Sequence, residues 1–426
     1  MDTSEDEARR LDASDPGHRD LFHIPPALGG PYPEAAYLAG NSLGLQPRAT
    51  RAGLLADLDA WARLGVDGHF RADRPWVPYY EALREPAARL MGALPSETVV
   101  MNSLTINLHL LMASFYRPAG GRTRIVIEDS AFPSDSYAVR GQARWHGLDP
   151  DTTVVRLRAR PGETALRTED IEAYLRADGD RVALILLGGV NYLTGEALEI
   201  EAVTAAGHAA GAVVGWDLAH AAGNLVLRLH EWGVDFAAWC SYKYLNGGPG
   251  AVAGAFIHER HLGDPALPRL DGWWGTEPAT RFEMAPVSRP LPTADAWQVS
   301  NPPILAMAPV RTSLELFDRV GMPVLRERSE RLTGYLAALI EAGLVKAITA
   351  RVSLVTPVDP RRRGCQLSLR IGGRDADELS DRLSRRYGVV TDAREPDIVR
   401  MAPVPLYSSY HDCWRAADAL AREVTV

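Results

Sequence analysis

Short apolar runs recur through the middle of the chain, separated by segments long enough to hold a helix. The segment at 124–128 has three apolar residues between Arg124 and Glu128 and reads as a strand. The runs at 182–187 and 212–216 are almost wholly apolar, which is typical of strands that are covered on both faces. Alternation of strands and helices from about residue 95 to residue 260 predicts a mainly parallel sheet with crossover helices. The pattern therefore indicates an α/β fold.

The pattern changes towards the C-terminus. A long helix is expected to begin near Ile304, and from about residue 320 helices mix with short strands around 352–355, 366–371, 389–390 and 398–402. This mixture predicts a small α+β domain that packs on the first domain. We therefore expect an N-terminal segment at 1–60 that packs with the small domain, a large domain at 61–310 and the small domain at 311–426.

Composition and charge narrow the class of protein. The 426 residues are 46% hydrophobic and 23% charged, and the formal net charge is -8. This acidic balance without a basic run argues against a nucleic-acid surface. The three cysteines, Cys240, Cys365 and Cys413, are too few for a disulfide framework and too far apart for a metal motif. The first residues lack the apolar core of a signal peptide, and the apolar runs are shorter than a membrane span. A cytoplasmic location is therefore expected.

Two chemically distinctive residues follow two of the predicted strands. Asp217 ends the run 212–216, and Lys243 follows a strand at 234–240 in surroundings that are small and uncharged. Taken singly, such an aspartate is more often a cap or turn residue, and a lone lysine is usually solvated. Together they meet the two needs of pyridoxal 5'-phosphate, a lysine amine for a Schiff base and an acid partner for the pyridine nitrogen. The pair therefore favours a pyridoxal phosphate site.

Longer stretches around this pair resemble the kynureninase family. These are DLAHAAGN (217–224) and WGVDFAAWCSYKYLNGGPG (232–250). Further matching stretches occur in the family's order: GNSLGLQP (40–47), NSLTINLHLLMASF (102–115), AFPSD (131–135), GWWG (272–275), SNPPIL (300–305), RGCQLS (363–368) and VRMAPVPLY (399–407). The resemblance implies a fold type I pyridoxal phosphate enzyme that hydrolyses kynurenine or 3-hydroxykynurenine to an anthranilate and alanine.

The resemblance also implies roles for individual residues. Lys243 would hold the cofactor, Asp217 would pair with its pyridine nitrogen, and Tyr242 is the candidate proton donor to the β-carbon of the substrate. The expected cofactor contacts are Leu104, Thr105, Phe132, Pro133, Ser134, Asp135, Asp217, His220, Tyr242, Lys243, Trp273 and Asn301. The expected substrate contacts are His69, Trp274, Ser300, Asn301 and Arg400.

Some features of the substrate and of the assembly follow only from the resemblance. The combination of His69, Ser300 and Asn301 resembles family members that prefer 3-hydroxykynurenine, and Asn301 would reach the site across a homodimer interface. Gly188 and Thr276 depart from the family pattern, so a ring-methylated substrate remains an alternative. Other fold type I enzymes, such as cysteine desulfurases or aminotransferases, and a non-enzymatic scaffold are further alternatives.

Overall fold

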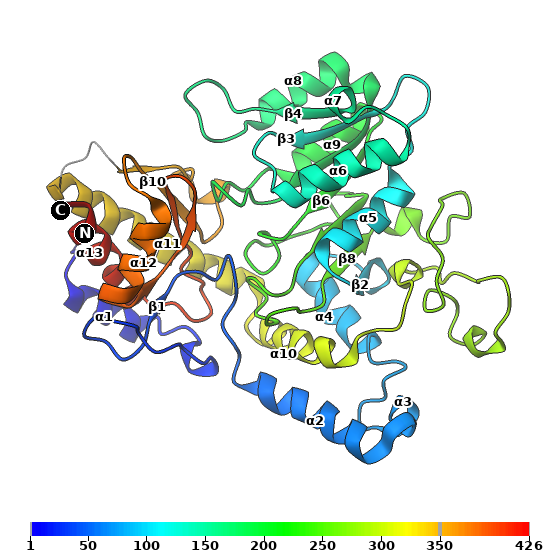
Figure 1. Cartoon of the computed structure of the whole chain (residues 1–426), viewed down its shortest axis with the longest axis horizontal. Coiled ribbons are helices and arrows are strands. Elements are labelled where there is room, and N and C mark those ends of the chain that lie inside the picture. The colour runs from blue at the N-terminus through cyan, green and yellow to red at the C-terminus, as the bar shows by residue number, and fades with distance from the viewer. Residues whose placement is uncertain (1, 348–351, 426) are drawn as a thin grey trace.

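A seven-stranded sheet forms the centre of the large domain in this computed structural model, which describes residues 2–347 and 352–425 (Figure 1). Its strands are β2 (Thr98–Val100), β3 (Arg124–Glu128), β4 (Val154–Leu157), β5 (Val182–Gly188), β6 (Val213–Asp217), β7 (Phe236–Trp239) and β8 (Gly254–Ile257). Their order is β2-β8-β7-β6-β5-β3-β4. Only β8, among these strands, runs antiparallel to its neighbours β2 and β7. The predicted α/β fold with a mainly parallel sheet is confirmed.

Helices cover both faces of this sheet. One face is covered by α4 (Glu81–Met91), α8 (Thr168–Asp178), α9 (Ile200–Ala209) and α10 (Ile304–Val320). The other face is covered by α5 (Leu104–Phe115) and α6 (Pro133–Trp145), and α7 (Pro150–Thr153) precedes β4. Successive residues of a strand point to opposite faces, so Leu187 belongs to one apolar core and Leu186 to the other. Burial on both faces explains why β5, β7 and β8 consist of apolar residues and glycine.

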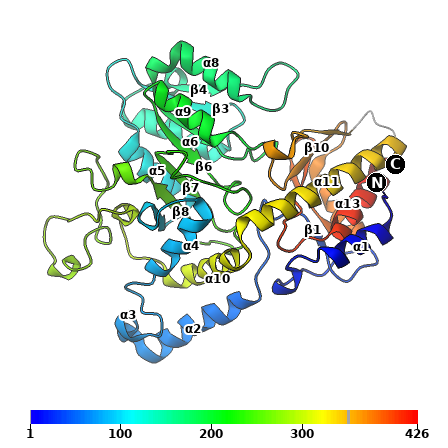
Figure 2. The same ribbon diagram turned by 180° about the vertical axis from the view of Figure 1, so that it is seen from behind.

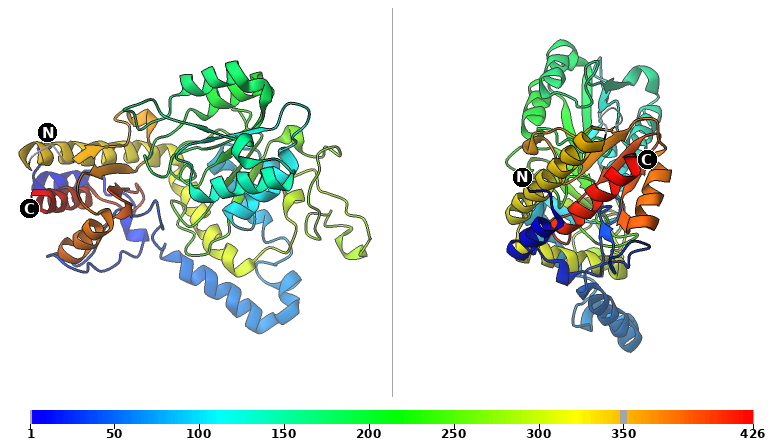
Figure 3. Two further views of the ribbon diagram at one scale, coloured as in Figure 1. Left: turned by 45° about the horizontal axis from the view of Figure 1, so that its top comes forward. Right: turned by 90° about the vertical axis from the view of Figure 1, so that its left-hand side faces the viewer.

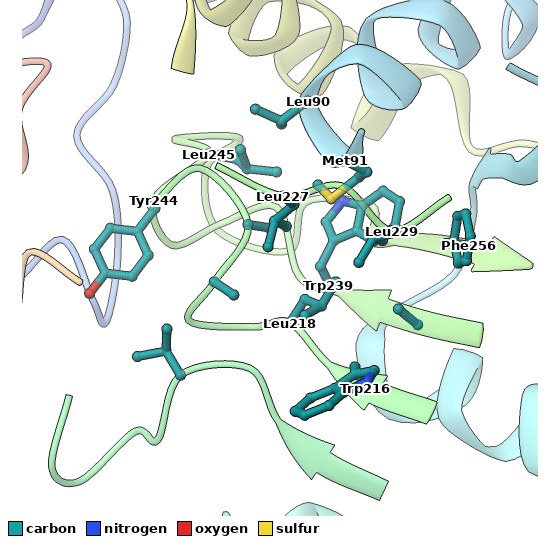
Figure 4. Close-up of a cluster of buried hydrophobic side chains, with 14 of the residues drawn as sticks. Leu90, Met91, Trp216, Leu218, Leu227, Leu229, Trp239, Tyr244, Leu245 and Phe256 are labelled. Carbon is teal, nitrogen blue, oxygen red and sulfur yellow. The ribbon is translucent and has the colours of Figure 1, made fainter. Parts of the chain in front are cut away.

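A buried apolar cluster lies where strands β6 and β7 end (Figure 4). Trp216 and Trp239 come from these two strands, and Leu90 and Met91 reach them from α4. The indole N–H of Trp216 donates to Thr204 Oγ1 at 3.1 Å, so this buried polar group is satisfied. Truncation of a buried tryptophan costs about 3–5 kcal/mol, so the cluster is a rigid support for the residues that follow these strands.

The small domain is built on an antiparallel sheet of order β12-β13-β10-β9. Its strands are β9 (Val352–Leu354), β10 (Leu367–Ile371), β12 (Asp392–Arg394) and β13 (Ile398–Met401), and its helices are α1 (Glu5–Ser14), α11 (Met322–Ala347), α12 (Ala376–Tyr387) and α13 (Tyr410–Thr425). The short strand β1 (Ala36–Tyr37) pairs in parallel with β11 (Val389–Val390). The predicted mixture of helices and strands is therefore found, with α13 as an additional helix.

The chain crosses between the domains at Gly321. Its φ of 86° is a backbone conformation that glycine adopts at low cost, because glycine has no side chain. Helix α10 packs against α2 (Ala49–Leu64) and α4, whereas α11 packs against α13 (Figure 2). The boundary at residue 310 stays a prediction, and these contacts favour Gly321 as the division. The N-terminal segment is divided in the same way, because α1 and β1 contact the small domain while α2 contacts the large one.

Two segments extend from the large domain (Figures 1 and 3). One consists of α2 and α3 (Gly68–Arg71), and the other is the long connection from β8 to α10, which lies on the side away from the small domain. Within the described ranges, every helix is too short or too polar to cross a bilayer. Short 3₁₀ helices are found at Arg19–Leu21, Gly65–Asp67, Pro95–Glu97, Gly179–Arg181, Glu259–His261, Arg281–Glu283, Ala294–Trp297 and Pro360–Arg362.

Candidate active site

A tight turn after β7 holds Lys243. The N–H of Asn246 donates to the carbonyl of Lys243 at 2.9 Å, and the N–H of Gly247 donates to the carbonyl of Ser241 at 2.8 Å. A Cβ at Gly247 would lie 2.8 Å from that same carbonyl oxygen, so only glycine fits. The N–H of Gly44 adds a hydrogen bond to the Tyr242 carbonyl at 2.8 Å. The backbone on both sides of the lysine is therefore fixed, as the glycines after it predict.

Asp217 is the last residue of β6 and lies between Gly188 of β5 and Ala238 of β7. It is buried, and its Oδ1 atom accepts a hydrogen bond from the N–H of Ala219 at 2.7 Å. The carboxyl ends of neighbouring parallel strands are where open α/β sheets place ligands. The carboxylate therefore stands at the position expected for a cofactor partner.

Lys243 and His220 are in direct contact. Lys243 Nζ lies 2.9 Å from His220 Nε2. Burial, followed by the charges of Lys243 and Arg400, lowers the pKa of His220 well below its ordinary value. The imidazole is therefore neutral and accepts a hydrogen bond from the lysine amine through Nε2, which leaves the proton on Nδ1. Nδ1 is buried and has no hydrogen-bond partner among the described residues.

A cavity of about 170 Å³ surrounds the lysine amine. Its lining includes most of the expected cofactor contacts, namely Leu104, Thr105, Phe132, Ser134, Asp135, Asp217, His220, Tyr242 and Lys243. Ser103, Glu128, Gly188, Val190, Tyr192 and Ala219 complete the lining. Pro133 is the first residue of α6 and directly follows Phe132. Elements that are far apart in the sequence therefore meet at one site.

Hydroxyl groups and helix N-termini meet at one end of this cavity. Thr105 Oγ1 lies 2.8 Å from Ser134 Oγ, and the two residues belong to the first turns of α5 and α6. Free amides of a first helical turn and hydroxyl groups both donate to an anion. This donor set suits the phosphate group of the cofactor.

Aromatic and acidic groups line the rest of the cavity. The Phe132 ring centroid lies 5.8 Å from Lys243 Nζ and packs edge to face on Tyr192 at 5.2 Å. Burial raises the pKa of the Tyr242 phenol to about 12, so it keeps its proton at neutral pH. With Asp217 opposite, the residues present fit pyridoxal phosphate: a phosphate site, an aromatic face, a carboxylate and a lysine.

Two further carboxyl groups line the cavity beside Asp217. Burial and the negative charge of Asp217 raise the pKa of Asp135 well above its usual range. Burial raises the pKa of Glu128 to about 7. No role was expected for Glu128, and its only signal in the sequence is a charged residue that directly follows the apolar run 125–127.

Arg400 belongs to β13 of the small domain and contacts the site through Tyr192. It is 1% exposed, and its guanidinium donates to Asp392 Oδ2 at 2.5 Å and to the Tyr192 carbonyl at 2.6 Å. Arg400 and Asp392 are opposite each other on β13 and β12. Burial lowers the pKa of Arg400 from its ordinary value. The arginine therefore contacts the backbone of Tyr192, a residue that lines the cavity.

Pro133, Arg400 and the remaining expected residues do not line the cavity of this chain. His69 belongs to α3 and packs edge to face on Trp76 at 5.2 Å. Trp273 and Trp274 belong to the connection from β8 to α10; Trp273 is 40% exposed and Trp274 is buried. Ser300 and Asn301, both exposed, directly precede α10. Thr276 pairs with Pro290 in the same connection.

Comparison with solved structures supports the class that the fold and the site define. The apo structure of a cysteine desulfurase from Thermococcus onnurineus NA1 has a TM-score of 0.76 at 18% identity, covering 92% of this chain and 94% of the other. A C-DES mutant with glycine covalently linked to its PLP cofactor has a TM-score of 0.76 at 16% identity, covering 92% and 96%. Fold and site together define a pyridoxal phosphate enzyme of fold type I.

Sequence comparison identifies the family within this class. Residues 325–420 match the model of the kynureninase C-terminal domain. The kynureninase of Salinispora tropica is 71% identical over 420 residues, covering 98% of this chain and 97% of that protein. The chain belongs to the kynureninase family. It is a pyridoxal-phosphate-dependent hydrolase that cleaves a carbon–carbon bond, releasing alanine and an anthranilate.

Proposed function

We propose that the enzyme prefers 3-hydroxykynurenine to kynurenine, and that its site is completed by a second copy of the chain. One observation carries the proposal that the site is shared. The residues expected to contact the substrate ring, with His69 and Asn301 among them, are absent from the lining of the Lys243 cavity of their own chain. At about 170 Å³ that cavity is also smaller than the roughly 300–1,000 Å³ typical of small-molecule sites.

The face that carries these residues is rich in exposed apolar side chains. Trp61, Phe70, Phe282, Met284 and Val287 are between 53% and 74% exposed. An apolar groove of about 460 Å³ lies on the same side, lined by Asp57, Trp61, Trp76, Pro303, Ile304, Leu305 and Ala306. Large exposed apolar patches are typical of association surfaces, and most soluble oligomers are symmetric dimers. These features support a homodimer in which each chain lends His69, Trp273, Ser300 and Asn301 to the cavity of its partner, whereas Trp274 stays buried in its own chain.

Residues within the Lys243 cavity suit the steps of the reaction. Bound pyridoxal phosphate supplies an electron sink for electrons at the substrate Cα. Lys243, which contacts His220, would move the Cα proton, and the buried carboxylate of Asp217 would pair with the pyridine nitrogen and favour its protonated form. The neutral phenol of Tyr242 is suited to protonate the β-carbon after cleavage. Arg400 offers a planar guanidinium for the α-carboxylate of the substrate.

The preference for a 3-hydroxyl group follows from hydrogen bonding. A buried hydroxyl without a partner costs about 1–3 kcal/mol, which is enough for about tenfold discrimination or more. His69 and Asn301 both carry groups that can pair with it.

Three buried cysteines without disulfides, Cys240, Cys365 and Cys413, support a cytoplasmic location.

Kinetics on three substrates test the proposed preference. We expect the highest kcat/KM for 3-hydroxykynurenine, compared with kynurenine and with a ring-methylated 3-hydroxykynurenine. His69→Ala and Asn301→Ala should narrow the ratio between the hydroxylated and the plain substrate. A higher kcat/KM for kynurenine would reject the role of the hydroxyl group, and a preference for the methylated compound would assign the enzyme to secondary metabolism.

A further inference from the structure

Glu128 is a buried carboxyl that the roles described above leave unused. It ends strand β3 and is 6% exposed. Its Oε2 atom accepts a hydrogen bond from Asn191 Nδ2 at 2.9 Å. Its Oε1 atom lies 3.0 Å from the position that a Cβ of Gly188 would occupy. Because Gly188 has no side chain, the carboxyl reaches the wall of the cofactor cavity.

A second cavity of about 270 Å³ is also bordered by Glu128. It is lined by Glu128, Asp129, Ser130, Leu157, Arg158, Ala159, Thr164, Leu166, Asn191 and Glu196. Glu128 is the one residue that lines both cavities. Arg158 is 76% exposed, so this outer cavity borders the solvent. A polar cavity of this size accommodates water molecules.

The charges around Glu128 allow it to gain and lose a proton near neutral pH. Asp217 and Asp135 face it from the cofactor cavity, and Glu196 faces it from the outer cavity. Glu196 is paired with Arg362 at 2.6 Å and accepts a hydrogen bond from the Leu166 N–H at 2.9 Å. Burial, together with the negative charges of Glu196 and Asp217, raises the pKa of Glu128 to about 7, which suits a group that takes up and releases a proton near neutral pH.

The established reaction releases a proton that has to leave the site. Water adds its hydroxyl to the carbonyl carbon and its hydrogen to the alanine fragment, so the aromatic product is formed as a carboxylic acid. Such an acid ionises at neutral pH, which frees a proton in each turnover. This balance is the same for kynurenine and for its 3-hydroxy derivative.

We propose that Glu128 is the proton relay between the cofactor cavity and the outer cavity. The Glu128 carboxylate takes the proton that the product acid loses, so one O–H bond breaks and another forms on Glu128. The protonated carboxyl then gives that proton to a water molecule of the outer cavity and returns to its carboxylate form. No oxidant or further reactant is needed. The relay rests on the kynureninase reaction and is independent of the proposed preference for a ring substituent.

Glu128→Gln tests the relay, because the amide keeps the shape and the polarity of the side chain but cannot carry a proton. Asp129→Asn is the matched control, since Asp129 lines only the outer cavity and is 42% exposed. With a pH indicator in weak buffer, proton release by the holoenzyme should keep pace with product formation. Glu128→Gln should slow steady-state turnover about tenfold or more and increase its solvent deuterium isotope effect. The control should match the wild type.

Infrared spectra of the apoenzyme give a readout that does not depend on activity. The absorption of protonated carboxyls that disappears as pH rises through about 7 should be smaller by one carboxyl in Glu128→Gln than in the wild type or in Asp129→Asn, because the neighbouring Asp135 contributes an absorption of its own. Turnover of Glu128→Gln within about twofold of the wild type, a lost affinity for pyridoxal phosphate, or an undiminished absorption in Glu128→Gln would each overturn the relay. The infrared measurement uses no substrate, so its result does not depend on the proposed reaction. If the wild type failed to act on kynurenines, the activity assay alone would show it.

Discussion

Lys243 Nζ and His220 Nε2 lie 2.9 Å apart, and the buried histidine is neutral. A neutral imidazole can accept a hydrogen bond from the lysine amine, whereas a protonated one would repel it. The contact therefore fixes the direction of the amine without adding a positive charge to the cavity. It also links two turns of the chain, because His220 follows β6 and Lys243 follows β7.

Asp217→Asn should weaken the binding of pyridoxal phosphate and lower turnover. A hydrogen bond to a charged group contributes about 1.5–3 kcal/mol, so the dissociation constant should rise about 10- to 100-fold. Titration of the apoenzyme with cofactor measures this change directly. The surface variant Asp151→Asn serves as the control, since the Asp151 side chain is 76% exposed. Unchanged cofactor affinity in Asp217→Asn would assign the pyridine partner to another acid.

Arg400→Lys should lower kcat/KM about tenfold or more, because lysine cannot form the two parallel hydrogen bonds of a guanidinium with a carboxylate. Asp392→Asn should have a smaller effect in the same direction, because Asp392 holds the Arg400 guanidinium at 2.5 Å. Arg370→Lys is a matched control on the neighbouring strand β10, with a side chain that is 48% exposed. Affinity for the cofactor should be unchanged in all three variants, and a loss of that affinity in Arg400→Lys would contradict a role limited to the substrate.

Glu128→Gln should change how the stability of the apoenzyme depends on pH. Burial raises the pKa of Glu128 from 4.5 to about 7, so between these values the folded state binds more protons than the unfolded state. The contribution of Glu128 to stability therefore falls as pH rises through this window. Glutamine lacks this loss, so the variant should gain up to about 3 kcal/mol over the wild type at pH 8 and little at pH 4.5.

Thermal unfolding of both apoenzymes across this pH range measures the effect as a difference in Tm. The Asp129→Asn variant should follow the wild-type curve, because Asp129 is 42% exposed. A constant difference in Tm between wild type and Glu128→Gln at all pH values would show that Glu128 titrates normally.

Mixing two impaired variants tests whether the site is shared between chains. In a mixed dimer of Lys243→Ala and Asn301→Ala, one shared site carries both substitutions and the other carries neither. Random exchange of subunits should therefore restore about one quarter of the wild-type sites and raise activity above that of either variant. A mixture of Lys243→Ala and Asp217→Asn should restore no wild-type site, because both residues line the cavity of the same chain. If the activity of the first mixture does not rise after proven exchange, each chain has a complete site of its own.

The central part of this site could be predicted from the sequence because it follows buried strands. The apolar runs before Asp217 and Lys243 are strands that are covered on both faces, so the positions where these strands end could be predicted. The edge of the sheet at which both residues lie could be predicted for the same reason. Strand β4 at the sheet edge is only partly buried along its length, which explains why its pattern is weak.

Other features of the site depend on packing that a single sequence does not encode. Glu128 was missed because many strands end in a charged residue, and the neighbouring sequence does not show that this carboxyl borders two cavities. The contact between Arg400 and Tyr192 joins residues of different domains, and only the folded chain reveals it. The positions of His69 and Asn301 away from the Lys243 cavity also became visible only in the structure.

Reduction of the holoenzyme with borohydride, followed by peptide mapping, tests the assignment of the cofactor site most directly. The chain contains two lysines, Lys243 and Lys346, so the map has a built-in control. The cofactor should be found on Lys243 alone. Lys243→Ala should lose both the absorption band of the lysine-bound cofactor and turnover, and Lys346→Ala should keep both. A cofactor found on Lys346, or full activity of Lys243→Ala, would contradict the account.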